Sequence, residues 1–186
     1  MADTIVGIPD PVHDAEAYVA RLRSALGSRD PVDVLRATPA DLRRAADDLS
    51  PQSLSTPEAK GKWSIRDVVQ HLADSELVAG YRLRMILAHD RPVLAGYDQD
   101  AWADRLRYAE SDVPAALEDF TRLRHANLRL LERTPTADRD RVGVHAERGE
   151  ESISDLVCLY AGHDIVHLQQ IARIRAVVHW RLSGSA

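Results

Sequence analysis

Two histidines, His163 and His167, are the residues of this chain whose type and spacing most directly suggest chemistry. They are four positions apart in a segment with helical periodicity, and residues at that spacing lie one turn apart on the same face of an α-helix. The apolar stripe of this helix passes through both positions, so both imidazoles are expected to be buried. A buried polar group without a partner costs roughly 1–3 kcal/mol, and a divalent metal ion would supply the partner. The pair alone is weak evidence, because a chain with 8 histidines readily contains one such pair by chance.

A third histidine, His71, falls on the predicted inward face of another helical segment. Three histidines from two facing helices, with no carboxylate or thiolate among them, form a neutral ligand set. Zn²⁺, Ni²⁺ or Fe²⁺ bound there would keep its full charge and at least one open coordination position. Such an ion lowers the pKa of a bound water to about 7, or binds a thiol as thiolate. The alternative, in which these side chains are ordinary core or surface histidines, stays open.

Four further residues are candidates for roles around such an ion. Asp74 and Gln170 share the faces of the predicted ligands one turn away, so we expect them to orient a ligand or to face a substrate. His145, on the connection before the last helix, is a candidate acid or base, and Asp74 is the other candidate for handling protons. Tyr81 is assigned to the same inward face as His71 and, with Gln170, is a candidate for contacting a bound cofactor. A core role for this tyrosine is the simpler alternative.

The composition is that of an ordinary globular chain. It has 186 residues, of which 45% are apolar and 28% charged, enough for one domain with a sizeable core. The net charge is −5, and the 24 basic residues are interleaved with 29 acidic ones, so nucleic acid is not an expected partner. No signal peptide and no membrane-spanning apolar run is evident, so we expect a cytoplasmic protein without a membrane partner. The single cysteine, Cys158, excludes an internal disulfide and fits a reducing compartment.

The predicted ligands lie on two of five segments in which apolar residues recur with the helical period: 13–26, 31–49, 64–89, 112–133 and from 152 onward. The last four predict an all-α helical bundle, and the first predicts an extra N-terminal helix. Ser64 and Ser152 are each followed three residues later by an aspartate, which is a helix-start signature. Pro39 either kinks the second segment or begins a new helix, and the sequence leaves this open.

The remaining stretches divide the chain and connect the helices. We assign residues 1–31 to an N-terminal arm and short helix, and residues 32–180 to the bundle domain. Residues 135–151 form a long connection, and connections of this length often line a site. Arg122 and Arg124, on the segment 112–133, are expected to belong to a solvated helix face.

An ordered series of motifs in this chain resembles the DinB/YfiT-like superfamily. The series runs from Lys62-Trp63-Ser64-Ile65 to His71-Leu72-Ala73-Asp74, Tyr97-Asp98 through Trp102, Gly143-Val144-His145, His163-Asp164-x-x-His167 and Gln170-Ile171. The resemblance covers roughly residues 32–178. It implies a four-helix bundle with up-down-down-up connections, frequently a homodimer. It also implies a divalent metal, often nickel or zinc, held by the histidines that match His71, His163 and His167.

Three functions follow from these expectations. The first is transfer of a low-molecular-weight thiol to an electrophilic small-molecule substrate through a metal-bound thiolate, an activity that the resemblance implies. The second is hydrolysis by metal-bound hydroxide, because many superfamily members are named only as metal-dependent hydrolases. The third is a non-enzymatic, metal-stabilised stress-response bundle. An open coordination position favours the first two, and the residues alone do not separate them.

Overall fold

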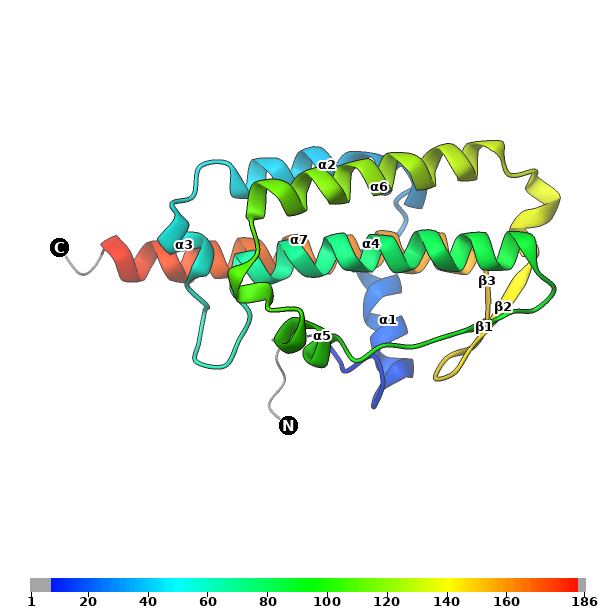
Figure 1. The fold of residues 1–186 in the computed structure, drawn as a ribbon, viewed down its shortest axis with the longest axis horizontal. Helices are drawn as coiled ribbons and strands as arrows, with labels where there is room; N and C mark the ends of the chain where they lie inside the picture. Colours follow the sequence, from blue (N-terminus) through cyan, green and yellow to red (C-terminus); the bar gives the residue numbers. More distant parts are fainter. Residues whose placement is uncertain (1–7, 184–186) are drawn as a thin grey trace.

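The computed structural model describes residues 8–183, in which four long helices lie side by side along the longest axis of the molecule (Figure 1). These helices are α2 (Pro31–Ala46), α4 (Ile65–Ala88), α6 (Val113–Arg133) and α7 (Ile153–Ser183). α4 and α6 run in one direction, and α2 and α7 run in the other (Figure 1). The predicted up-down-down-up bundle is therefore confirmed. The first seven residues of the predicted arm lie outside the described residues.

The order of the helices around the bundle explains the long connections. α4 contacts both α6 and α7, and α2 contacts the same two helices. Since α4 and α6 are parallel neighbours, residues 89–112 must return along the whole bundle between them (Figure 1). This connection carries β1 (Val93–Leu94), α5 (Gln99–Arg105) and the 3-10 helix η1 (Tyr108–Glu110). The other connections carry α3 (Pro51–Ser55), the 3-10 helix η2 (Thr136–Asp140), β2 (Val142–His145) and β3 (Gly149–Ser152).

A small three-stranded sheet at one end of the bundle was not predicted from the sequence. β2 pairs with β1 in parallel and with β3 in an antiparallel hairpin. The strands have only two to four residues, too few for a clear alternating pattern, and their pairing depends on contacts distant in sequence. The sheet places His145 at the end of β2, beside Leu94 of β1.

The starts of the two helices that carry the histidines follow their predicted chemistry. Ser64 Oγ accepts a hydrogen bond from the Asp67 backbone N–H, and the Asp67 carboxylate accepts one from the Ser64 N–H. Ser152 and Asp155 repeat the same reciprocal bonds at the start of α7. Both helix starts are thus capped locally, which agrees with the Ser-x-x-Asp signature.

The extra N-terminal helix, α1 (Ala15–Leu26), crosses α7 at a steep angle (Figure 1). The crossing point is Gly162, where an added Cβ would lie 2.3 Å from the Leu22 carbonyl oxygen. Because any larger residue would push the two backbones apart, the glycine permits this close approach. It brings Tyr18 and Leu22 against the segment of α7 that carries the histidine pair.

The main apolar core lies between the four long helices and under α1, and a smaller cluster packs at the end that carries the sheet. The second cluster consists of Leu83, Ile86, Leu94, Leu131, Ile153 and Leu156. No helix among residues 8–183 combines the length and the apolarity that crossing a bilayer requires.

A buried arginine joins all four helices of the bundle. Arg124 of α6 is only 2% exposed, and its guanidinium donates hydrogen bonds to Glu76 of α4 (2.8 Å) and Asp164 of α7 (2.6 Å). It also donates to the Leu35 carbonyl oxygen of α2 (2.9 Å). The expectation that Arg124 is solvated is wrong, whereas Arg122 is 72% exposed as expected. Two residues along a helix differ by about 200° in direction, so these two arginines point to opposite sides of α6.

Pro39 lies inside one continuous helix, α2, which answers the question that the sequence left open. Proline has no N–H, so the carbonyl oxygen four residues earlier, that of Leu35, lacks its usual partner within the helix. Arg124 donates to that oxygen. The cost of a proline inside the helix is therefore partly offset by an acceptor for a buried charge.

Replacing Arg124 by methionine tests this junction. Arg124→Met leaves the carboxylates of Glu76 and Asp164 buried without their cation, so we expect the free energy of unfolding to fall by about 3–5 kcal/mol. Arg122→Met, two positions away on the exposed side, should change it by less than about 0.5 kcal/mol. Urea denaturation followed by circular dichroism measures both. Equal effects of the two substitutions would contradict the role assigned to the junction.

Candidate metal centre

The three predicted ligands converge on one point between two helices. His71 comes from α4, and His163 and His167 come from adjacent turns of α7. The Nε2 atom of His163 lies 3.1 Å from Nε2 of His71 and 3.1 Å from Nε2 of His167. One nitrogen from each ring lies within 4.8 Å of the others. The geometric prediction that the three rings meet is confirmed.

The nitrogen spacing fits a tetrahedral metal ion. Three nitrogens bound at 2.0–2.1 Å with tetrahedral angles would lie about 3.3 Å apart, close to the distances between these rings. All three side chains are buried. Burial lowers the pKa of His167 to about 4, and it holds the pKa values of His71 and His163 well below their usual range. The rings are therefore neutral at pH 7, which is the state that binds a metal.

Gln170 sets the orientation of one of these rings. Its Oε1 atom lies 2.8 Å from Nδ1 of His167. An amide oxygen only accepts hydrogen bonds, so Nδ1 carries the proton and Nε2 keeps its lone pair toward the other two rings. The structure thus places Gln170 behind His167, as a residue that fixes the tautomer rather than as a direct ligand. On the other side of the cluster, the Trp63 ring packs 4.9 Å from the His71 ring, centroid to centroid.

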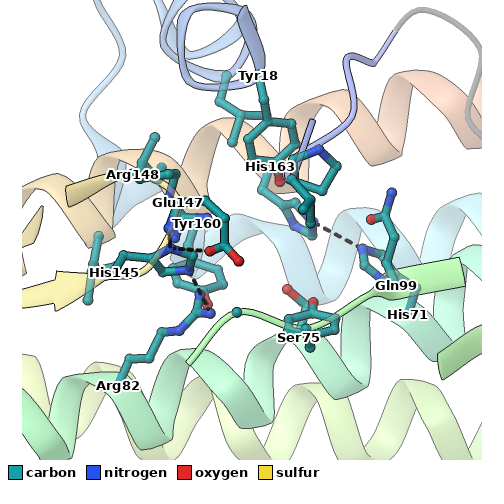
Figure 2. Close-up of a pocket in the computed structure, with 17 residues that line it drawn as sticks. Tyr18, His71, Ser75, Arg82, Gln99, His145, Glu147, Arg148, Tyr160 and His163 are labelled. Atoms are coloured by element: carbon teal, nitrogen blue, oxygen red, sulfur yellow. Dashed lines mark hydrogen bonds and ion pairs between the residues drawn. The ribbon is translucent and has the colours of Figure 1, made fainter. Parts of the chain in front are cut away.

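A pocket opens beside the histidines, and Figure 2 shows the side chains that surround it. His71 and His163 form part of its wall, and α1, the segment after β1 and the turn between β2 and β3 form the rest. The polar side chains that line it are Tyr18, His71, Ser75, Arg82, Tyr97, Gln99, His145, Glu147, Arg148, Tyr160 and His163. The connection of residues 135–151 therefore lines the site, as its length suggested.

His145 lies in this pocket between two charged residues. Its Nδ1 is 2.8 Å from the Glu147 carboxylate and 3.3 Å from the Glu147 backbone nitrogen. The carboxylate is the closer of the two and can only accept, so we place the proton on Nδ1. Nε2 then accepts a hydrogen bond from Arg82 at 3.1 Å. Burial, together with the charges of Arg148 and Arg82, lowers the pKa of His145 to about 4. Both ring nitrogens are already bonded within the protein, so the ring holds Arg82 and Glu147 in place.

Two other predicted site residues lie elsewhere. Tyr81 is 57% exposed, so the prediction that it faces the bundle interior beside His71 is wrong. It lies about 80° around the helix from His71, on the side away from α6 and α7. Asp74 does not line the histidine pocket; it accepts a hydrogen bond from Gln70 and lines a separate surface depression next to η1. Three residues turn a helix by about 300°, which carries Asp74 around toward η1.

Sequence reasoning missed the charged residues of the pocket. Arg82 follows His71 by eleven positions, or about three full turns, so the two share one side of α4. This spacing could have identified Arg82. Glu147 and Arg148 are next to His145 in the sequence, but nothing local indicates that the turn between β2 and β3 folds over the pocket. Only the pairing of β2 with β1 and β3 brings them there.

Comparisons with known proteins agree with this fold and these residues. A family model described as the DinB superfamily matches residues 35–171. A protein of Bacillus licheniformis is 32% identical over 149 residues, covering 78% of this chain and 84% of its own length. A protein of Oceanobacillus iheyensis is 31% identical, covering 75% of this chain and 80% of its own. Both carry the name "Putative metal-dependent hydrolase".

A solved structure has the same fold. YfiT from Bacillus subtilis, described as a probable metal-dependent hydrolase with an unusual four-helix bundle topology, superimposes with a TM-score of 0.74. The match covers 96% of this chain and 95% of that chain at 23% sequence identity. The family match includes the positions of all three converging histidines. From the fold, the histidine cluster and the family match together, we conclude that the chain belongs to the DinB superfamily.

Proposed function

We propose that this protein is a metal-dependent hydrolase that acts on a small molecule bound in the pocket beside His71 and His163. The observation that carries the proposal is the convergence of three neutral, buried imidazoles, two of which form the wall of an open pocket. The names of the relatives from Bacillus licheniformis and Oceanobacillus iheyensis support it. Three histidine ligands leave a further coordination position free, which is typical of catalytic rather than structural zinc sites.

The ligand set determines which ions fit and what they would supply. Imidazole nitrogens suit Zn²⁺, Ni²⁺ and Fe²⁺, so the predicted choice of nickel or zinc, with iron as a further candidate, is kept. A divalent ion held there would lower the pKa of a water or thiol at its open position. His71 reaches the site from α4, while His163 and His167 reach it from α7. Gln170 keeps the His167 lone pair directed at the ion.

Glu147 is the residue that we propose to accept the proton from the nucleophile. It is the one acidic side chain in the wall of the pocket as the described residues form it. Its carboxylate projects into the pocket beside His145 (Figure 2), and the side chain is 26% exposed. Gly96 makes room for it, because an added Cβ there would lie 2.5 Å from a Glu147 carboxylate oxygen. His145 donates to that carboxylate and so keeps it ionised and ready to take a proton.

Thiol transfer, which the resemblance implied, would use the same three ligands and stays a prediction. A thiol needs to lose a proton as a water does, so Glu147 would serve either reaction. The difference lies in the co-substrate, which an assay can vary directly.

Metal analysis tests the shared premise of both reactions. Purified protein should contain about one divalent ion per chain, and His167→Ala should lose it, whereas replacing the exposed His125 by alanine should not. Gln170→Leu should weaken metal affinity by about 10–100-fold, because it removes the bond that orients His167. Inductively coupled plasma mass spectrometry and competition with a chelator measure these values. Unchanged metal content in His167→Ala would refute the ligand assignment.

Substitution of Glu147 tests the proton acceptor. Glu147→Gln should lower kcat/KM by about 10²–10⁴-fold with full metal content, whereas Glu150→Gln, an exposed position on the same hairpin, should leave it unchanged. Turnover of 4-nitrophenyl esters and anilides is followed without thiol, and that of monobromobimane with added cysteine. Turnover without thiol supports hydrolysis, and turnover that requires thiol supports transfer. Loss of both in a protein that unfolds when its metal is removed would support the non-enzymatic alternative.

A further inference from the structure

Arg82 is a buried cation without a carboxylate partner. It is 5% exposed, and within the described part of the chain its guanidinium bonds only to neutral groups. These are the Ala95 carbonyl oxygen (2.7 Å), the Tyr160 hydroxyl (3.3 Å) and His145 Nε2 (3.1 Å). Its Nε–H has no acceptor among the described residues. Burying a charge is costly unless an opposite charge or a full set of hydrogen bonds compensates it.

The other well-buried arginines of this protein show what Arg82 lacks. Arg124 bonds to the carboxylates of Glu76 and Asp164. Arg148, which lines the same pocket as Arg82, bonds to the carboxylate of Glu151 through two of its nitrogens. Arg82 alone of these three has no acid in contact, although it is as inaccessible as they are.

The nearest acid in the pocket does not occupy the position at Arg82. Glu147 bonds to Nδ1 of His145, while Arg82 bonds to Nε2, so the imidazole ring stands between the two charges. Glu147 offsets the charge of Arg82 at a distance but places no oxygen on its N–H groups. The pocket therefore contains one cation whose direct partner must come from outside the described chain.

We propose that Arg82 is the anion subsite of this pocket and that the molecules bound there carry a single carboxylate. A guanidinium matches the shape of a carboxylate or a phosphate. Only one cation is uncompensated, because Arg148 is held by Glu151, so a monoanion is favoured over a phosphate dianion. Tyr160, which accepts from Arg82 through its hydroxyl, gives the subsite a further polar edge.

The position of Arg82 on α4 suggests how such a molecule would lie. His71 and Arg82 share one side of a rigid helix, with about 16 Å between their backbones, and their side chains meet the same pocket. A molecule anchored at Arg82 by its carboxylate would thus point its other end toward the histidines. This last step rests on the proposed hydrolase function, whereas the anion subsite itself does not.

Binding of simple probes tests the subsite without any catalytic readout. Benzoate and its neutral isostere benzamide are titrated into the metal-loaded protein by calorimetry. Benzoate should bind at least about tenfold more tightly, and Arg82→Gln should remove that difference. The exposed Arg122→Gln should keep it. Equal affinities for benzoate and benzamide in the unaltered protein would overturn the proposal.

Two further measurements protect the test against misfolding and against binding at the metal. In the unaltered protein, the ¹⁵N–¹H signal of the Arg82 Nε–H should shift on adding benzoate and not on adding benzamide. In His167→Ala, which lacks the metal site, benzoate should still bind; loss of binding there would place the anion on the ion and overturn the subsite. Inorganic phosphate binding more tightly than benzoate would overturn the assignment to a carboxylate. Absence of hydrolysis with intact benzoate binding would refute the proposed function alone.

Discussion

The buried guanidinium of Arg124 is the contact on which the geometry of the rest depends. It bonds to α2, α4 and α7 from α6, so one planar group sets how the four helices meet. Its partner Asp164 directly follows His163 in the sequence, and its partner Glu76 lies five positions after His71. The same network that holds α4 against α7 therefore also sets the separation of the imidazoles. Pro39 takes part in it by leaving the Leu35 carbonyl oxygen available.

The pocket separates two kinds of polar group that would interfere with each other if they were mixed. At one end the three histidines are neutral and desolvated, which suits a metal ion. At the other end His145 stands between Arg82 and Glu147, so that a cation and a carboxylate are kept apart yet both face the cavity. Because α4 carries both His71 and Arg82, a rigid element fixes the distance between the two ends.

The parts outside the four helices exist in this structure largely to close the pocket. The small sheet folds the turn that carries Glu147 over the bundle, and α1 covers the pocket from another side by approaching α7 at Gly162. Relatives named as metal-dependent hydrolases and the YfiT structure share this fold over most of their length. A common bundle that positions ligands, combined with connections that shape the pocket, is a familiar way for one fold to serve several substrates.

The sequence by itself determined the features that depend on neighbouring residues along one helix. The pairing of His163 with His167, the capping of α4 by Ser64 and Asp67, and the burial of His71 all follow from local spacing. Tertiary structure decided which direction a charged or aromatic side chain takes when its helix has neighbours on several sides. Arg124 was expected in solvent and is buried, and Tyr81 was expected inside and is exposed, because the positions of α6 and α7 define the buried arc of each helix. Glu147 entered the pocket through strand pairing between distant segments, which no spacing along the chain encodes.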